Sequence, residues 1–366
     1  MGASVKPKQL IFAFPGDLST PTGGYAYDRR IIEGLRDLGW QIELLSLGYD
    51  FPYPSQETIA KARQLLLNLR LDIPVVMDGL ALGVLPEIVA ELATRHPIIA
   101  LIHHPLALET GLSIEQADIL KASEALSLRH VKQVIVNSPT TAQHVAKFLG
   151  VQEQSIQVVF PGTDRPVLIN PPEISPLSPS EGLHLLSVGS VIHRKGFDVL
   201  IAALQPLADL PWTLSIAGDI SRDDVALKKL QEDIHYFGFK DRVHVLGVVT
   251  AEHMELLYGQ ADIFVLASRF EGYGMAYAEA LARGLPVIGT NAGAISETVP
   301  AGAGLLVPPD DIKSLTAALR KVMQDRNYRF ELSQGARKVA AQQSTWEDSA
   351  KRFSEIIYSF AFSDEN

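Results

Sequence analysis

The strongest constraint on the fold is an alternation between short, β-branched apolar runs and longer segments in which apolar residues recur at helical spacing. This alternation is typical of parallel βαβ units. A first helix is expected from about Tyr25 to Leu38, with Gly39 as its stop. In the first part of the chain, strands are predicted at Leu10–Phe14, Gln41–Ser46, Ile73–Asp78, Pro97–His103, Gln133–Asn137 and Ile156–Phe160.

The alternation stops between Pro166 and Ser180, where five prolines exclude both a helix and a central strand. It then restarts, which predicts a second doubly wound sheet. The expected domains are residues 1–165 and 182–345, joined by a linker over residues 166–181. The strands of the second domain are predicted at Leu183–Gly189, Trp212–Asp219, Val243–Gly247, Ile263–Ser268 and Pro286–Thr290.

The segment from Trp346 to Phe362 has the pattern of a long amphipathic terminal helix. Its apolar side is formed by Phe353, Ile356, Ile357 and Phe360.

Composition limits the class of protein. A chain of 366 residues is long enough for about two domains at roughly 150 residues each, and 47% hydrophobic residues supply their cores. The formal net charge of −10 argues against a nucleic-acid partner, because a polyanion would meet an unfavourable overall field. With no cysteine, disulfides, thiolate nucleophiles and cysteine metal sites are excluded.

Neither a targeting segment nor a membrane span is expected. The apolar run that ends at Phe14 is too short for the hydrophobic core of a signal peptide. The longest apolar stretch, around residues 73–93, is interrupted by Asp78, Glu87 and Glu91. A cytoplasmic location is therefore predicted, with peripheral contact to a membrane left open.

The most informative motif runs from Ser268 to Ile288 and reads as strand, glycine-containing turn, helix, glycine stop and strand. Gly272 and Gly274 would let backbone N–H groups approach an anion at a helix N-terminus, as in a phosphate-binding site. Glu271 lies in the predicted loop and Glu279 more than one turn inside the helix, so both could reach one ligand if that ligand is extended. An ordinary helix cap with two surface glutamates is the alternative.

With its two glutamates, the segment EGYGMAYAEALARGLPVIGT resembles the glutamate pair of the retaining glycosyltransferases of the GT-B fold, specifically family 4, also called glycosyl transferases group 1. The resemblance extends over nearly the whole chain through TGGYAYDRR, LIHHP, VIVNSPTT, VVFPGTD, VGSVIHRKGFDVLIAAL and LYGQADIFVLAS. It implies two Rossmann-like domains facing a cleft. The first would bind the acceptor, the second the nucleotide-sugar donor, and the C-terminal helix, residues 346–366, would return to the first domain.

The resemblance also assigns donor-site roles. It implies that Glu279 binds the ribose hydroxyls and Glu271 the hydroxyls of the transferred sugar. Arg194 and Lys195 would neutralise the diphosphate leaving group; alone, such a pair also fits a solvated helix start. Backbone amides of Gly274, Met275 and Ala276 would contact the sugar and the distal phosphate. Many relatives carry an arginine where this chain has Ser190, which leaves Ser190 at most a hydrogen-bond donor.

Three further segments are expected to contact the donor. Gly23 and Gly24 precede the first helix and could bring backbone amides to the diphosphate, although a simple turn would use the same residues. His103 directly follows a strand, where the family places a histidine near the anomeric centre. His103 is preferred over His104 for this reason, and a structural role remains the alternative. Gly247 and Val248, at another strand end, would contact the base.

The sequence contains no Asp-x-Asp and no HExxH motif, so no metal or other cofactor is expected. The predicted function is transfer of a hexosyl unit, with retention, from a nucleotide diphosphate sugar to a hydroxyl of a carbohydrate or lipid-linked acceptor. UDP-glucose is the first donor to test, and bacterial polysaccharide or glycolipid assembly the expected setting. The alternatives are nucleotide-sugar hydrolysis or epimerisation on the same fold, and a non-catalytic nucleotide-sugar binding protein.

Overall fold

The computed structural model describes residues 8–164 and 182–361. Two compact units make up the chain: residues 1–162 with residues 346–366, and residues 163–345. The predicted linker, residues 166–181, lies outside the described residues. The second unit begins at Thr163, whose amide donates to the carbonyl of Ser344 at 2.9 Å.

The first unit contains a six-stranded parallel sheet with the order β2-β1-β3-β4-β5-β6. Its strands are β1 Gln9–Phe14, β2 Gln41–Ser46, β3 Val75–Asp78, β4 Ile98–Ile102, β5 Gln133–Val136 and β6 Ile156–Val158. Its helices are α1 Gly23–Asp37, α2 Gln56–Leu67, α3 Gly79–Leu82, α4 Pro86–Leu92, α5 Ile114–Leu128, α6 Pro139–Leu149 and α14 Trp346–Ala361.

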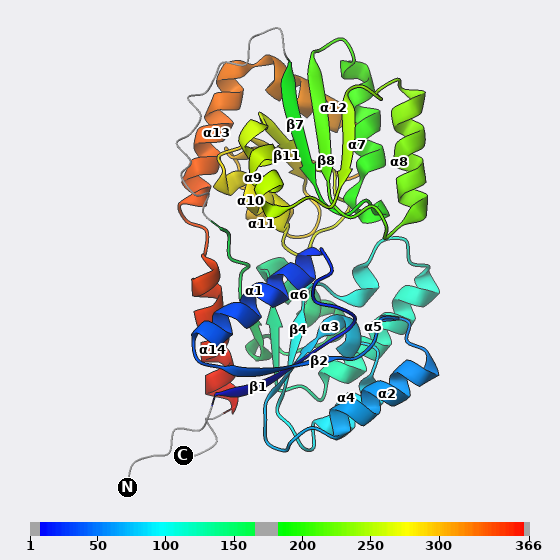
Figure 1. The fold of residues 1–366 in the computed structure, drawn as a ribbon, viewed down its shortest axis with the longest axis vertical. Coiled ribbons are helices and arrows are strands. Elements are labelled where there is room, and N and C mark those ends of the chain that lie inside the picture. Colours follow the sequence, from blue (N-terminus) through cyan, green and yellow to red (C-terminus); the bar gives the residue numbers. More distant parts are fainter. Residues whose placement is uncertain (1–7, 165–181, 362–366) are drawn as a thin grey trace. The chain divides into compact units, whose positions relative to one another are not determined.

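Helix α14 packs against α1 in the first unit, where the family resemblance places the C-terminal helix (Figure 1). Phe353, Ile356 and Ile357 are buried, and the indole N–H of Trp40 donates to Ser354 Oγ at 2.8 Å. The approach is so close that a Cβ atom on Gly34 would lie 2.4 Å from Cβ of Ala350. The last helix therefore packs against a helix that lies more than 300 residues earlier in the sequence.

The second unit has a six-stranded parallel sheet with the order β12-β11-β10-β7-β8-β9. Its strands are β7 Leu183–Val188, β8 Trp212–Ala217, β9 Val243–Gly247, β10 Ile263–Val265, β11 Val287–Thr290 and β12 Gly304–Val307. Its helices are α7 Phe197–Leu204, α8 Asp224–Tyr236, α9 Ala251–Gln260, α10 Met275–Ala282, α11 Ile295–Thr298, α12 Ile312–Gln324 and α13 Arg326–Ala340.

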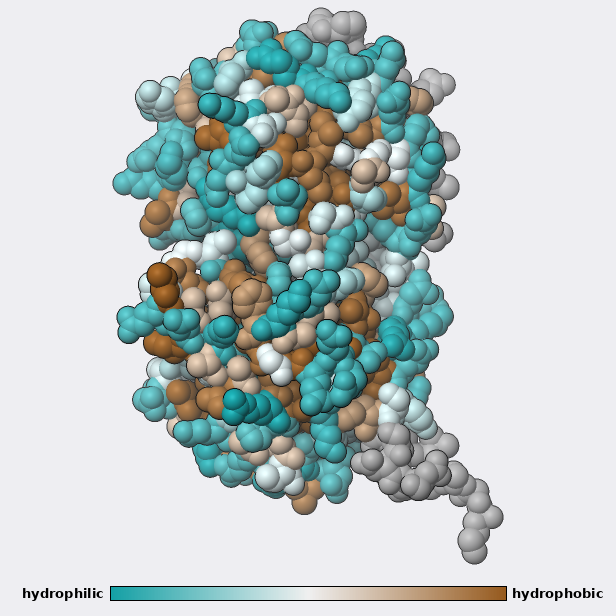
Figure 2. Space-filling view, turned by 180° about the vertical axis from the view of Figure 1, so that it is seen from behind, coloured by the Kyte–Doolittle hydropathy of each residue, from teal (hydrophilic) through white to brown (hydrophobic). Residues whose placement is uncertain are grey.

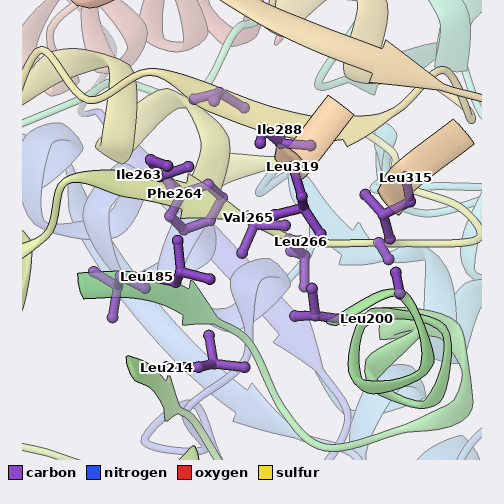
Figure 3. Close-up of a cluster of buried hydrophobic side chains, with 14 of the residues drawn as sticks. Leu185, Leu200, Leu214, Ile263, Phe264, Val265, Leu266, Ile288, Leu315 and Leu319 are labelled. Carbon is purple, nitrogen blue, oxygen red and sulfur yellow. The ribbon is translucent and has the colours of Figure 1, made fainter. Parts of the chain in front are cut away.

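The core of the second unit lies between the strands and the flanking helices (Figure 3). Leu185, Leu214 and Phe264 from the strands meet Leu200 of α7 and Leu319 of α12, and all five are fully buried. Central strands covered by helices on both faces must be apolar throughout, which explains their continuous hydrophobic runs.

The predicted strands are present, with ends that differ by up to three residues. The largest difference is at β10, which ends at Val265 rather than at Ser268. The reason is that Ser268 already belongs to a loop, where its hydroxyl donates to Glu271. Strand β12 is a correction to the sequence analysis, which places no strand there. It is only four residues long and begins with glycine, so the pattern is too weak to predict it.

On the face of the molecule in Figure 2, apolar residues are interspersed among hydrophilic ones. Among the described residues, no helix is both long enough and apolar enough to cross a membrane.

Candidate active site

Both sheets have a point where the strand order reverses, and ligands of doubly wound folds bind beside the carboxyl ends of the strands at such a point. In the second unit the reversal lies between β7 and β10, which pair directly. The loop after β7 carries Ser190, Arg194 and Lys195, and the loop after β10 carries Glu271 and Gly274. The topology therefore brings together donor-site residues that are predicted from two distant segments.

Glu271 is at the centre of this cluster. Its Oε1 accepts hydrogen bonds from Lys195 Nζ at 2.6 Å and from Ser268 Oγ at 2.7 Å, and its Oε2 accepts from Arg194 Nη1 at 3.3 Å. The residue is only 6% exposed. Burial alone would raise the pKa of Glu271, but the charges of Lys195 and Arg194 outweigh it and lower the pKa. The carboxylate is thus held ionised by the two cations predicted to bind phosphate.

Gly274 forms the N-cap of α10 with φ +89, a left-handed conformation that favours glycine. A Cβ atom there would also lie 2.8 Å from the ring of Tyr277. Met275 and Ala276 follow as the first helical residues. The first N–H groups of a helix have no carbonyl partner within it, so the amides of this turn can serve an anion.

The other glutamate, Glu279, lies one turn further along α10. Its Oε2 accepts a hydrogen bond of 2.8 Å from the hydroxyl of Tyr258, and burial raises its pKa. Tyr258, on α9, is 1% exposed, and the guanidinium of Arg283 lies 4.3 Å from the centre of its ring. Tyr258 was not predicted as a site residue. It belongs to the LYGQAD segment, but its contact with Glu279 spans 21 residues.

Arg269 is a second residue that the sequence analysis missed. It forms a bidentate ion pair with Asp198 at 2.7 and 3.0 Å, and its Nε donates to Asp310 at 2.8 Å. Its Nη1 also donates to the backbone carbonyl of His193, directly before Arg194 and Lys195. This arginine therefore ties the loop after β7 to the loop after β10.

The remaining predicted donor contacts lie along the same edge of the sheet. Hydrogen bonds join Gly189 to the end of β8 and Gly218 to Gly247, at 2.9 Å each, so the loops after β7, β8 and β9 are neighbours. Ser190 is buried, while Val248 is 61% exposed and accessible to a ligand.

In the first unit the structure brings His103 and Gly24 into contact. A Cβ atom on Gly24 would lie 3.2 Å from Cδ2 of His103. A Cβ atom on the preceding residue, Gly23, would have no other atom within 4 Å. His104 turns to a different partner, Glu109, at 3.3 Å. The two histidines thus occupy distinct surroundings, and His103 is the one beside the predicted glycine segment.

Two aspartates that were not predicted flank His103. Its Nε2 lies 3.1 Å from Oδ1 of Asp28 and 3.7 Å from Oδ2 of Asp78. Asp28 lies on α1, one turn after Gly24, and Asp78 is the last residue of β3. Oxygen and nitrogen atoms in such a set can also bind a cation, but here Nε2 of His103 already contacts Asp28. The expectation that the protein needs no metal stays a prediction.

The fold and the clustered residues place the protein in the class of two-domain GT-B glycosyltransferases. The chain belongs to glycosyltransferase family 4: the family profile described as Glycosyltransferase Family 4 matches residues 23–165, and the profile described as Glycosyl transferases group 1 matches residues 174–339.

Several curated proteins are similar to this chain. An uncharacterized glycosyltransferase of Methanocaldococcus jannaschii is 26% identical over 66% of this chain, and the lipopolysaccharide core biosynthesis mannosyltransferase LpsB of Rhizobium meliloti is 34% identical over 38% of it. The matched segments span 63% and 40% of the lengths of these two relatives. The MMP alpha-(1->4)-mannosyltransferase of Mycolicibacterium hassiacum is 24% identical over 82% of this chain and 74% of its own.

Solved structures share the fold. Sucrose-phosphate synthase from Thermosynechococcus elongatus superposes with a TM-score of 0.79 at 20% identity, covering 95% of this chain and 98% of its own. HepE of Anabaena, in complex with UDP and glucose, gives a TM-score of 0.75 at 18% identity, covering 95% and 99%.

Proposed function

We propose that the protein transfers a hexosyl unit from a nucleotide diphosphate sugar to a hydroxyl group of an acceptor, with retention of configuration. The observation that carries this proposal is the cluster of Lys195, Arg194 and Glu271 beside the N-terminus of α10, at the point where the strand order of the second sheet reverses. Positive charge and the amides of a helix N-terminus at this point fit a diphosphate next to a sugar.

The chemical argument concerns charge in the transition state. As the bond between C1 and the phosphate oxygen breaks, negative charge grows on the diphosphate and positive charge on the sugar. Lys195, Arg194 and the first amides of α10 would stabilise the leaving group more strongly than the bound substrate, which accelerates the reaction. Glu271 would accept hydrogen bonds from hydroxyl groups of the sugar while keeping both cations in place.

Retention without a covalent intermediate agrees with the surroundings of Glu271. A carboxylate that accepts hydrogen bonds from Lys195, Arg194 and Ser268 is a poor nucleophile, because its charge is already shared among three donors. We therefore favour attack of the acceptor from the same face as the leaving group, with a phosphate oxygen taking the acceptor proton.

Further contacts complete the proposal. Glu279 would bind the ribose, Gly247 and Val248 the base, and Ser190 a phosphate. From the first unit, His103 would contact the transferred sugar and the Gly23–Gly24 segment the diphosphate.

The donor is proposed to be UDP-glucose, because HepE, a structural neighbour, was crystallised with UDP-glucose. Several curated relatives are named mannosyltransferases, so GDP-mannose is the second donor to test. A carbohydrate or a lipid-linked acceptor is proposed, in polysaccharide or glycolipid assembly.

The test has two stages. Calorimetric titration with UDP-, GDP- and ADP-sugars should identify one donor, and transfer to a panel of acceptors should then give a product whose anomeric configuration matches that of the donor. Transfer should persist in excess chelator. Inversion, or activity that is lost in chelator and restored by metal, would contradict the mechanism. Turnover without acceptor would favour hydrolysis or epimerisation, and binding without any turnover a non-catalytic role.

A further inference from the structure

The cluster around His103 joins three elements of the first unit: α1, the end of β3 and the segment after β4. Asp28 is fully buried and Asp78 is 3% exposed. One carboxylate oxygen from each and a ring nitrogen of His103 lie within 4.8 Å of one another. Two carboxyl groups therefore share one imidazole in a place with little access to water.

This arrangement has an electrostatic consequence. The Oδ2 atom of Asp28 is buried and has no hydrogen-bond partner. Two ionised carboxylates so close together would repel each other, and burial would deprive them of solvation. Positive charge on the imidazole, together with a proton on one carboxyl group, relieves both penalties.

The directions of the pKa shifts of Asp78 and His103 agree with this geometry. Burial, reinforced by the charge of Asp28, raises the pKa of Asp78 to about 7. Burial alone would lower the pKa of His103, but Asp28, and to a smaller extent Asp78, reverse the direction and raise it. Both effects keep protons within the cluster near neutral pH.

Packing fixes where the ring lies. The ring of Tyr27 meets it edge to face with centroids 5.4 Å apart, and the hydroxyl of Tyr27 donates to the carbonyl of Val159 at 3.1 Å. Gly24 lies against another edge. The ring therefore cannot turn far from its bond with Asp28.

We propose that Asp28 and Asp78 are positioning residues that hold His103 as an imidazolium, with its Nε2–H donated to Asp28, so that Nδ1–H is a hydrogen-bond donor for the ligand. The proposal that this donor serves the sugar or the leaving group rests on the proposed function. The protonation state and the orientation of His103 do not depend on the proposed function.

The first test needs no substrate. Histidine-labelled protein, with ten histidines in the chain, is titrated by NMR, and the signal of His103 is assigned with His103→Gln. We expect a pKa above the ordinary value and a proton on Nε2. The Asp28→Asn variant keeps an oxygen acceptor but removes the charge, and should lower the His103 pKa by about one unit or more. Asp78→Asn should lower it less.

Glu109→Gln is the matched control, because Glu109 pairs with the neighbouring His104. It should leave the titration of His103 unchanged. An ordinary or lowered His103 pKa in the wild-type protein would overturn the proposal, even if a variant failed to fold. So would loss of the His103 titration on adding Zn²⁺ at low micromolar concentration, since the cluster would then be a cation site.

A second readout addresses the link to transfer. In Asp28→Asn, the decline of kcat at alkaline pH should move to lower pH in parallel with the His103 pKa, while KM for the donor changes little. A shifted NMR titration with an unshifted pH profile would overturn the catalytic part alone. If no donor is turned over by the wild-type protein, the proposed function fails while the NMR result still decides the state of His103.

Discussion

Lys195 Nζ donates to Oε1 of Glu271 over 2.6 Å, although the two residues are 76 positions apart in the sequence. The pair joins a residue predicted to bind phosphate to one predicted to bind the sugar. A change at either residue therefore alters the electrostatic surroundings of the other. Their contributions to catalysis are expected to depend on each other.

We expect Lys195→Met to lower kcat about 10- to 100-fold, as for the loss of a charge-assisted hydrogen bond worth about 1.5–3 kcal/mol. The donor KM should change much less, because the charge on the leaving group appears mainly in the transition state. Steady-state kinetics at saturating acceptor check this. Lys228→Met, in the exposed part of α8, is the control and should behave like the wild-type protein.

Glu271→Gln should weaken binding of the nucleotide-sugar but not of the free nucleotide. Combined with Lys195→Met, its effect on kcat should be smaller than the product of the two single effects, because each variant already breaks the same ion pair. A double-mutant cycle measures this coupling. Strict additivity would mean that the contact plays no part in transfer.

Tyr258→Phe should weaken binding of the free nucleotide several-fold, and Glu279→Ala should weaken it more. The reason is that the Tyr258 hydroxyl fixes Oε2 of Glu279 and leaves the other oxygen for the ribose. Calorimetry with the free nucleotide checks both variants. Tyr236→Phe, at an 82% exposed position on α8, is the matched control. Unchanged affinity in Glu279→Ala would remove the ribose assignment.

Glu124, on α5, should make the stability of the first unit depend on pH. Its Oε2 accepts from the amide of Leu106 at 2.9 Å, its Oε1 has no hydrogen-bond partner, and burial raises its pKa to about 8. Between about pH 4.5 and 8 the folded state retains a proton that the unfolded state has lost. The free energy of unfolding therefore falls as pH rises through this window, by at most about 1.4 kcal/mol per pH unit.

Glu124→Gln removes this contribution, so its stability relative to the wild-type protein should increase from pH 5 to pH 8. Denaturant unfolding or amide exchange of α5 at several pH values measures the difference. Asp78 contributes the same pH dependence to the free energy of unfolding of both proteins, so its contribution cancels in the difference. Parallel stability curves for the two proteins would contradict the prediction.

Two helical glycines should respond to alanine in opposite ways. In α1, Gly34→Ala would push its Cβ to 2.4 Å from Cβ of Ala350, and we expect a loss of about 1–3 kcal/mol from overpacking against α14. In α9, a Cβ atom on residue 259 would have no neighbouring atom within 4 Å. Gly259→Ala should therefore raise the free energy of unfolding by up to about 1 kcal/mol through the helix propensity of alanine. Amide exchange in α1 and α14 should become faster in Gly34→Ala and stay unchanged in Gly259→Ala. If Gly34→Ala were as stable as the wild-type protein, α14 would be able to move away from α1 without cost.

Much of the fold could be predicted because its signals are local. Apolar runs of strand length, helical spacing and glycine stops each fall within a few adjacent residues, so the two sheets follow from the sequence except for β12, whose four residues begin with glycine. The same holds for Glu271, Gly274 and Glu279, which lie on one turn and one helix. Their separation along the chain largely determines their separation in space.

The partners of these residues were decided by the tertiary structure. Lys195 reaches Glu271 because β7 and β10 are neighbours in the second sheet, although two strands lie between them in the sequence. Asp28, Asp78 and His103 meet because α1 and the ends of β3 and β4 converge at one edge of the first sheet. Sequence patterns report which residues share a local element, whereas strand order and helix packing determine which distant side chains are buried together and therefore which charges they hold.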